Sequence, residues 1–301
     1  MKKPNKIAVL MGGPGEEREV SLKSGKAIIE ALQANSYDVS SIIIDADLVN
    51  LVEKLSRVDL VFLGLHGDIG ENGTIQGFLE ALGIIYTGSG TLSSAICMDK
   101  NISKIVAANN NILTPKWKLY NNINDNDAFK YPLVVKPNGQ GSTVGLRIVH
   151  NEEELKPALE HAFNYDTSVL VEEYIEGREL TVMVLDGKAY PVCEIIPSHE
   201  LYDFDCKYTA GMSKYICPAK IGLELTDNIQ QVSENLFDLF KCENYSRADF
   251  RMDSQNKFWF LEMNTLPGMT DTSLVPMSAL AAGLSFNDLI DKIVMQAWKK
   301  K

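Results

Sequence analysis

Residues 246–264 read SRADFRMDSQNKFWFLEMN. Two runs of alternating polar and apolar residues flank the turn-forming residues 253–256, so this stretch predicts a β-hairpin. Side chains along a strand alternate between the two faces of a sheet. One face of the hairpin should therefore be wholly apolar, formed by Ala248, Phe250, Met252, Trp259, Leu261 and Met263.

The other face of this hairpin should be polar. It carries Arg247, Asp249, Arg251, Glu262 and Asn264. A four-residue loop would place Arg247 opposite Glu262, with Asp249 diagonal to it. Two carboxylates and an amide oxygen beside an arginine suit a hard cation such as Mg²⁺. A solvated face with surface salt bridges is the alternative, and the spacing alone does not decide between the two.

The N-terminal part alternates between short apolar runs and helical patterns. Apolar runs at 7–11, 39–44 and 60–65 predict strands, and the first ends in the turn sequence GGPG. This alternation predicts a parallel sheet with ligands at the carboxyl ends of its strands. Two amphipathic helices should each bury one face, comprising Val20, Ala27, Ile28, Ala31 and Leu32 in the first and Ile75, Phe78, Leu79 and Leu82 in the second.

The rest of the chain has a different pattern. Residues 99–110 look helical, and apolar runs at 131–137 and 169–175 predict strands. Short strands dominate from residue 179 onward, and the last 25 residues look helical again. We therefore expect an α/β unit at the N-terminus, a small α+β unit in the middle and a larger α+β unit at the C-terminus.

A glycine-rich loop follows the strand at 131–137. It reads PNGQGSTVG over residues 137–145, directly after Lys136. The backbone N–H groups of such a loop can surround phosphate oxygens, and the lysine would add a point charge. It is not a Walker A loop, because no lysine follows its final glycine. A charged residue at the end of an apolar strand favours an anion site over an ordinary turn.

The composition excludes several classes of protein. With 45% hydrophobic and 23% charged residues, the 301-residue chain is neither disordered, collagenous nor a coiled coil. A net charge of −11 repels phosphate backbones, so we expect no nucleic-acid partner. No apolar run has the length of a membrane span or a signal-peptide core. Five scattered cysteines predict no disulfide framework, which favours a cytoplasmic protein with no membrane partner.

Four motifs make the sequence resemble the D-alanine–D-alanine ligases over nearly the whole chain. They are HGDIGENGTIQG at 66–77, YTGSG at 86–90, RAD at 247–249 and LEMNTLPG at 261–268. The resemblance implies the ATP-grasp fold, which is α/β, with α+β in the C-terminal part. It also implies three domains, namely an N-terminal α/β substrate-binding domain over 1–88, a central ATP-grasp subdomain over 89–176 and a C-terminal ATP-grasp catalytic subdomain over 177–301.

The resemblance also implies a reaction. The family uses ATP to join two D-alanines into D-alanyl-D-alanine, with ADP and phosphate as the other products, for peptidoglycan precursor synthesis. The first carboxylate becomes an acyl phosphate, and the amine of the second D-alanine, which must lose a proton, attacks it. The implied cofactors are ATP and Mg²⁺, with two ions per site and Mn²⁺ as a substitute. A homodimer is implied as well.

Individual residues match the motifs of the family. Those implied in catalysis are Glu17, Ser142, Tyr208, Arg247 and Gly268. Those implied in binding D-alanine are His66, Lys207, Ser273 and Leu274. Those implied in binding ATP are Lys100, Lys136, Glu172 and Glu179, of which Glu179 would take the ribose. The implied metal ligands are Asp249, Glu262 and Asn264, in agreement with the polar face of the hairpin.

Some of these matches carry a more specific expectation. Glu17 would hold the ammonium of the first D-alanine, in a Ser-x-Glu-x-x-Val-Ser pattern whose first serine is replaced here by Gly15. Arg247 and the backbone N–H of Gly268 would hold the developing oxyanion. Arg251 matches no residue of the family pattern.

A lid over the reaction centre is expected at residues 201–213. Such a lid would exclude water from the acyl phosphate. It contains Lys207 and Tyr208, and the tyrosine favours the dipeptide over D-alanyl-D-lactate. Cys206, beside them, is expected to be an incidental thiol.

Three other functions deserve comparison with this one. A non-catalytic nucleotide-binding protein of the same fold should have lost a metal ligand or Arg247, and none is missing. A sister ligase with another amine or hydroxy-acid acceptor is disfavoured by Tyr208, Ser273 and Leu274. A nicotinamide dehydrogenase is excluded, because the G-x-G-x-x-G fingerprint is absent.

Overall fold

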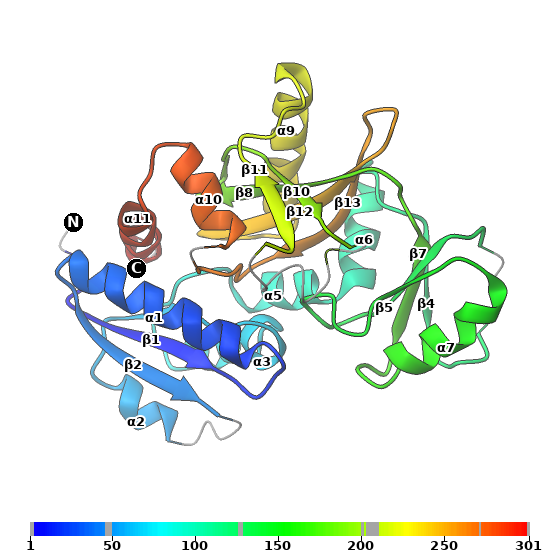
Figure 1. The fold of residues 1–301 in the computed structure, drawn as a ribbon. Coiled ribbons are helices and arrows are strands. Elements are labelled where there is room, and N and C mark those ends of the chain that lie inside the picture. Colours follow the sequence, from blue (N-terminus) through cyan, green and yellow to red (C-terminus); the bar gives the residue numbers. More distant parts are fainter. Residues whose placement is uncertain are drawn as a thin grey trace.

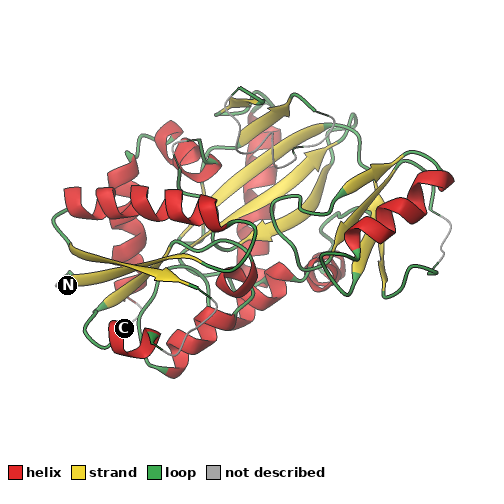
Figure 2. Ribbon diagram, turned by 60° about the horizontal axis from the view of Figure 1, so that its bottom comes forward, coloured by secondary structure: helices red, strands yellow, loops and turns green. Residues whose placement is uncertain are grey.

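The computed structural model describes residues 3–45, 50–125, 129–199, 202, 211–270 and 272–299. These residues form three β-sheets with helices beside each of them (Figure 1). The N-terminal sheet lies at one end of the molecule and the smaller antiparallel sheet at the other, and a second view shows the same order (Figure 2). The expected fold class is confirmed, since a parallel sheet comes first and antiparallel sheets follow.

The first sheet is parallel and has the strand order β2-β1-β3. Its strands are β1 (Lys6–Gly12), β2 (Asp38–Ile44) and β3 (Leu60–Leu63). The helices beside it are α1 (Arg18–Ala34), α2 (Leu51–Leu55), α3 (Asp68–Glu71) and α4 (Thr74–Ala81). Parallel strands need a crossover connection, and α1 provides it by burying Ile28, Ala31 and Leu32 in the same core as β1.

The last helix, α11 (Phe286–Lys299), packs against α1. Its apolar residues Leu289, Ile290 and Ile293 belong to the core of the first sheet. The Tyr37 hydroxyl donates to Asp291 Oδ1 at 2.7 Å, which links the residue before β2 to this helix. Both ends of the chain therefore contribute to one core, and the domain limits at residues 88 and 176 stay a prediction.

The middle of the chain forms an antiparallel sheet of order β4-β7-β5-β6. Two helices precede it, α5 (Thr91–Met98) and α6 (Lys100–Asn109). Its elements are β4 (Trp117–Tyr120), β5 (Leu133–Pro137), β6 (Arg147–Val149), α7 (Glu152–Ala162) and β7 (Val169–Glu173). Helix α7 covers one face of this sheet and buries Ala158, Leu159 and Ala162 in its core (Figure 1).

The largest sheet has the order β11-β10-β8-β12-β13, and β9 pairs with β8. Its strands are β8 (Arg178–Leu185), β9 (Lys188–Ala189), β10 (Cys193–Pro197), β11 (Ser213–Ile216), β12 (Tyr245–Met252) and β13 (Phe258–Asn264). Its helices are α9 (Leu223–Leu239) and α10 (Leu274–Ala281). Strands dominate this region as expected, but the sequence did not predict α9, whose buried stripe is only Ile229, Ser233, Leu236 and Phe237.

The predicted hairpin is β12 and β13, but its register differs from the expected one. Arg247 lies opposite Asn264, and Asp249 lies opposite Glu262, so the expected pairing of Arg247 with Glu262 is wrong. The loop spans five residues, 253–257, and a β-bulge interrupts the pairing after Asp249. A bulge adds one residue to one strand, which shifts every partner beyond it.

The same bulge changes which side chains of β13 are buried. Phe258, Phe260 and Met263 are buried, whereas Trp259 and Leu261 are only partly so. The expected apolar face is therefore confirmed for β12 and wrong for Trp259 and Leu261. Strict alternation fails here because Phe260 and Met263 lie on the same face although they are three positions apart in sequence.

Both predicted N-terminal helices form, and most of their predicted buried residues are buried, although Ala27 is only partly so. Ile75 and Leu79 of α4 are fully buried, and Phe78 packs partly against the same core. Leu82 is 39% exposed, so its expected burial is wrong. It is the C-cap residue of α4, where the chain turns away from the sheet.

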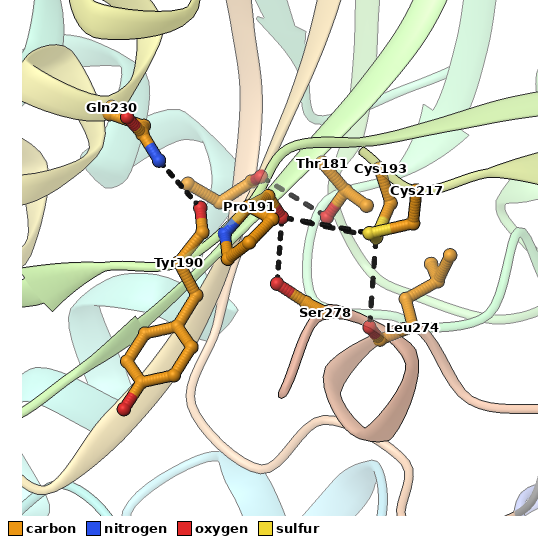
Figure 3. The surroundings of a disulfide bond; sticks show 9 residues. Thr181, Tyr190, Pro191, Cys193, Cys217, Gln230, Leu274 and Ser278 are labelled. Carbon is orange, nitrogen blue, oxygen red and sulfur yellow. Dashed lines mark hydrogen bonds between the residues drawn. A yellow bond between two sulfur atoms is a disulfide. The ribbon is translucent and has the colours of Figure 1, made fainter. Parts of the chain in front are cut away.

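A disulfide joins Cys193 and Cys217, which are 24 residues apart in sequence (Figure 3). The cysteine spacing did not predict this bond. Cys193 begins β10 and Cys217 follows β11, so the bond lies at the end of two paired strands. Its surroundings include Leu274 of α10, whose carbonyl oxygen lies 4.0 Å from Cys193 Sγ. Cys97 and Cys242 are free and buried.

None of the helices in the described ranges combines the length and the apolar composition that a membrane span needs.

Candidate active site

Two adjoining pockets lie between the sheets. The first is lined by residues of β5 and β7 on one side and of β8, β12 and β13 on the other. The second lies among the start of α1, the loop after β3 and the loop that follows β13. Tyr202, Arg247 and Glu262 line both pockets. A ligand in one pocket can therefore reach a ligand in the other at these three side chains.

All the predicted site residues that the structure describes line one of these pockets. The first pocket takes Lys100, Lys136, Glu172, Glu179, Arg247, Asp249 and Glu262. The second takes Glu17, His66, Ser142, Arg247, Glu262, Asn264, Gly268, Ser273 and Leu274. Lys207 and Tyr208 lie outside the described residues, as does Cys206.

Buried lysines mark one end of the first pocket. Lys136 ends the apolar strand β5, and its Nζ lies 2.5 Å from Glu172 Oε1. Lys100 begins α6, where the Asp99 side chain caps the helix, and its Nζ donates to the carbonyl of Gln140 at 2.5 Å. The sequence places both ammonium groups beside the glycine-rich loop, which fits an anionic ligand.

Glu172 lines the first pocket, but two lysines pair with its carboxylate. Besides Lys136, it pairs with Lys104 Nζ at 2.8 Å, and Lys104 also donates to Thr114 Oγ1 at 2.5 Å. Glu172 and Lys104 are almost completely buried. Burial opposes the ionisation of Glu172, yet the two ammonium groups lower its pKa, so the carboxylate stays charged.

Lys104 was not predicted as part of this site. Burial lowers its pKa to about 8, against the opposing attraction of Glu172. Its position one helical turn after Lys100 was the available signal, because residues four apart share a face of a helix. Its side chain pairs with Glu172 but does not line the first pocket.

The glycine-rich loop approaches the start of α1 very closely. The Ser142 hydroxyl donates a hydrogen bond to Glu17 Oε1. A Cβ on Gly141 would lie 2.9 Å from Glu17 Oε2, and a Cβ on Gly67 would lie 2.5 Å from the same atom. Only glycines allow the two loops to enclose this carboxylate. Glu17 is thereby held at the junction of the two pockets' loops.

His66 is neutral and fixed from both sides. Its Nδ1 lies 2.9 Å from the carbonyl of Leu266, and its Nε2 lies 2.9 Å from the Ser24 hydroxyl. Burial lowers the pKa of His66, and Glu17 only partly offsets this. The network assigns the proton to Nδ1, which donates to the carbonyl, while Nε2 accepts from Ser24.

Glu71, a residue that sequence reasoning quoted but did not assign, lines the second pocket. Its carboxylate accepts from the backbone N–H of Gly67 at 2.8 Å and of Leu266 at 3.2 Å. Burial and the nearby charge of Glu17 raise the pKa of Glu71 to about 8. The carboxyl group thus joins the loop after β3 to the loop after β13.

Arg247 and the predicted metal ligands form one cluster on the polar face of the hairpin. Arg247 Nε and Nη2 donate to the two oxygens of Asp249 at 2.9 and 2.7 Å. Burial opposes the charge of Arg247, but Asp249 and Glu262 raise its pKa above the ordinary value. Asn264 Nδ2 donates to Asp249 Oδ2 at 3.0 Å, and Lys100 Nζ lies 3.5 Å from Glu262 Oε2.

This cluster offers a metal two carboxylates and one amide. Within the described ranges, no three His, Cys, Asp or Glu side chains gather in a way that could hold a metal ion. The donors are nevertheless all hard oxygens, and Mg²⁺ commonly uses one or two carboxylates together with substrate phosphates. The register places Asp249 directly opposite Glu262, beside the lysine end of the first pocket. The donor set therefore fits Mg²⁺.

The far end of the second pocket is the loop that leads into α10. Ser273 is the N-cap of α10, and its Oγ accepts from the backbone N–H of Thr270 at 3.0 Å. A Cβ on Gly268 would lie 2.9 Å from the same Oγ, so a larger residue there would displace the Ser273 hydroxyl. Anionic groups are favoured at a helix N-terminus, which suits this end to a carboxylate.

Tyr202 is the residue of this site that the sequence gave least reason to expect. Its carbonyl accepts from the Thr143 hydroxyl at 2.9 Å, and its hydroxyl lies 3.0 Å from that of Tyr215. Burial and the contact with Tyr215 raise its pKa. No motif marks Tyr202, and only its place within the predicted lid, residues 201–213, could have indicated it.

Comparisons with known proteins agree with this geometry. Residues 106–295 match the family model described as D-ala D-ala ligase C-terminus, and residues 6–54 and 46–89 match that for the N-terminus. A D-alanine–D-alanine ligase of Syntrophotalea carbinolica is 44% identical over 98% of this chain and 97% of its own.

Two solved structures are also similar to this chain. A D-alanine–D-alanine ligase from Bacillus anthracis complexed with ATP has a TM-score of 0.88 and 37% identity, with 99% of this chain and 98% of that one covered. The VanG D-Ala:D-Ser ligase from Enterococcus faecalis has a TM-score of 0.85 and 32% identity, with 98% and 100% covered.

Proposed function

The chain belongs to the D-alanine–D-alanine ligase family, and on this premise we propose that it joins two D-alanines into D-alanyl-D-alanine at the expense of ATP. Its fold is the ATP-grasp fold of that family. The product serves peptidoglycan precursor synthesis. In the first step a D-alanine carboxylate oxygen attacks the γ-phosphorus and ADP leaves. In the second, the amine of another D-alanine attacks the acyl carbon and phosphate leaves.

The observation that carries this proposal is the meeting of the two pockets at Arg247 and Glu262. Phosphoryl transfer to a carboxylate requires the nucleotide and the amino acid to be held in one arrangement, which lowers the entropic part of the barrier. A first pocket with two lysines beside a glycine-rich loop and a second pocket with carboxylates and a helix N-terminus meet this requirement. A protein that binds a ligand without catalysing a reaction would need only one of these pockets.

The nucleotide belongs in the first pocket. Lys100 and Lys136 would hold its phosphates, and the glycine-rich loop would close around them. Glu172 then acts mainly by fixing Lys136, since its own carboxylate is occupied by lysines. Glu179 would receive the ribose, because a carboxylate accepts hydrogen bonds from hydroxyl groups and repels phosphates.

Asp249, Glu262 and Asn264 would hold Mg²⁺, with two ions per site and Mn²⁺ as a substitute. When bound, such ions neutralise charge on the phosphate oxygens. The side chains of Asp249 and Glu262 are 13% and 24% exposed, so they can reach a ligand in the first pocket. Asp249 would be shared between the metal and Arg247, which keeps the arginine in place for the oxyanion.

The two D-alanines belong in the second pocket. Glu17 would hold the first ammonium, with Ser142 fixing that carboxylate. The neutral His66 lines the same pocket, and its one N–H is donated to the Leu266 carbonyl. The acceptor's carboxylate would bind at Ser273 and Leu274, at the start of α10. Arg247 and the Gly268 N–H would stabilise the oxyanion of the tetrahedral state.

Three further parts of the proposal rest on family membership alone. Lys207 and Tyr208 would belong to a lid that keeps water from the acyl phosphate. The enzyme would be a homodimer, which light scattering can test. It would be cytoplasmic, where ATP is available and where the Cys193–Cys217 bond would be reduced.

A second candidate acceptor is D-serine, because one of the similar structures is a D-Ala:D-Ser ligase. D-serine differs from D-alanine by one hydroxyl, and an apolar site rejects such an addition only about a hundredfold. Leu274 is the apolar group of this chain at the acceptor end of the pocket.

The test is a reaction with ATP, Mg²⁺ and D-alanine in which phosphate release and product mass are measured together. Parallel reactions offer D-serine, D-lactate or L-alanine as the competing acceptor. Phosphate release matched by D-alanyl-D-alanine is the expected result. Preferential formation of D-alanyl-D-serine would favour the second candidate, and ATP binding without turnover would contradict both.

A further inference from the structure

Arg251 faces the nucleotide pocket but matches no residue of the family pattern. It lies in β12 directly opposite Glu179 of β8, and its Nη1 is 3.8 Å from Glu179 Oε2. The two side chains are only 12% and 16% exposed. A charge with so little access to water needs an ion-pair or hydrogen-bond partner, because burying an unpaired charge costs free energy.

The same guanidinium also binds the segment that joins the two antiparallel sheets. Residues 174–177 lie between the end of β7 and the start of β8. Arg251 Nη1 donates to the carbonyl of Gly177 at 3.1 Å, and its Nη2 donates to the Tyr174 hydroxyl at 3.1 Å. The guanidinium carbon lies 5.4 Å from the centre of the Tyr174 ring, within the range of a cation–π contact.

This connecting segment is also held close to β12 by its backbone. A Cβ on Gly177 would lie 2.0 Å from the carbonyl oxygen of Met252, a distance that no side chain tolerates. Gly177 has a φ of 150°, which favours glycine. Arg251 and the glycine therefore fix the same segment to the same strand, and Tyr174 and Ile175 of that segment line the pocket.

Only arginine can make these three contacts at once. Its planar fork carries five N–H donors, whereas a lysine offers a single rotating point charge. The attraction over 3.8 Å draws the Glu179 carboxylate toward the connecting segment. The lysines that would hold phosphate come from β5 and α6, so the arginine is not one of the phosphate ligands.

We propose that Arg251 is a positioning residue, which holds the Glu179 carboxylate in place for a ribose hydroxyl and ties residues 174–177 to β12. This inference rests on the proposed function, in which the first pocket takes ATP. It adds the group that determines how strictly the enzyme distinguishes a ribonucleotide from a deoxyribonucleotide. Arg251 acts through Glu179 and need not touch the nucleotide itself.

The experiment compares kcat/KM for ATP, 2′-deoxy-ATP and 3′-deoxy-ATP, with D-alanine saturating. The enzymes are the wild type, Arg251→Met, Glu179→Gln and the double variant. The wild type should prefer ATP over one of the two deoxynucleotides. Arg251→Met should reduce that preference by about tenfold, the size of one hydrogen bond to a charged group. The double variant should show no further loss, because both changes remove the same interaction.

Arg178→Met is the matched control. Arg178 is the sequence neighbour of Glu179 on the opposite face of β8, and it pairs with Glu194 at 2.6 Å rather than facing the pocket. It should lower the melting temperature without changing the nucleotide preference. Arg251→Lys keeps the charge and should retain part of the preference, which provides a second test if the methionine variant does not fold.

Two results would overturn the inference. One is a wild-type enzyme that is active with D-alanine but uses both deoxynucleotides as well as ATP. The other is an unchanged preference in Arg251→Met and Arg251→Lys together with a loss of stability like that of Arg178→Met. Failure of the proposed function is distinct from both, because the wild type would then form no D-alanyl-D-alanine with ATP.

Discussion

The Ser142 hydroxyl donates a hydrogen bond to the Glu17 carboxylate, although 125 residues separate the two in sequence. Ser142 belongs to the loop that would hold the phosphates, and Glu17 directly precedes α1 of the N-terminal unit. This single bond therefore connects the nucleotide side of the site to the amino-acid side. Gly67 and Gly141 also pack against the Glu17 carboxylate, which leaves it little room to move away from Ser142.

Removing this bond should impair the use of the first D-alanine more than the binding of ATP. We expect Ser142→Ala and Glu17→Gln each to reduce kcat/KM for D-alanine by about a hundredfold, since a charge-assisted hydrogen bond and the place of the carboxylate are lost. KM for ATP should change little. The double variant should be no worse than the poorer single one, because coupled residues are not additive.

The neighbouring Thr143 provides the control for that series. Its hydroxyl donates to the Tyr202 carbonyl instead, and Thr143→Ser keeps this donor. The variant should retain nearly full activity. Strictly additive losses in the Ser142 and Glu17 variants would show that the two side chains act separately, contrary to the prediction.

Glu262→Gln should weaken the dependence of turnover on magnesium without unfolding the protein. The change removes one anionic oxygen opposite Asp249, while Asp249 remains paired with Arg247. We expect the Mg²⁺ concentration for half-maximal activity to rise at least tenfold. Titration of activity with MgCl₂ measures this. Glu224→Gln, on the exposed first turn of α9, is the matched control, and equal magnesium curves for both variants would contradict the metal assignment.

The hairpin shows how far the sequence alone could predict this site. Its composition was sufficient to identify two strands, an apolar face and a polar face, and in the structure the polar face lines the first pocket. The register was not predictable, because it depends on a bulge after Asp249 that no residue type marks. This error does not affect the metal prediction. The bulge places Glu262 opposite Asp249 rather than opposite Arg247, so the two carboxylates still lie next to each other.

Other parts of the structure depend on contacts that no local pattern records. Helix α9 has a narrow apolar stripe among polar residues, so its period was weak compared with the strands around it. Lys104 and Tyr202 became part of the site only through tertiary packing against Glu172 and Thr143. By contrast, Lys136 could be identified from sequence, because a charge that ends an apolar strand is rare enough to indicate a ligand.

The Cys193–Cys217 bond should stabilise the protein under oxidising conditions. It closes a loop of 24 residues, and the chain-entropy estimate for a loop of this length is about 3 kcal/mol. Addition of dithiothreitol should therefore lower the melting temperature by several degrees, measured by calorimetry. Cys193→Ser should melt at the lower temperature with or without the reductant. Identical melting of the oxidised and reduced wild type would show that the bond contributes nothing to stability.

ATP affinity should fall as the pH rises through about 8, because Lys104 then loses its proton. Below this pH the ammonium holds Glu172 and adds positive charge beside Lys136. Above it that charge is lost, and the anionic nucleotide is bound less tightly. At pH 9 only about a tenth of the lysine would be protonated, so Kd for ATP should rise up to about tenfold between pH 7 and pH 9. Calorimetric titration without D-alanine measures this, since the amine of the substrate cannot then contribute.

Lys104→Met, which has no charge to lose, should bind ATP weakly and almost equally at both pH values. A wild-type Kd that stays constant over this range would show that Lys104 keeps its proton and is not the source of any pH dependence.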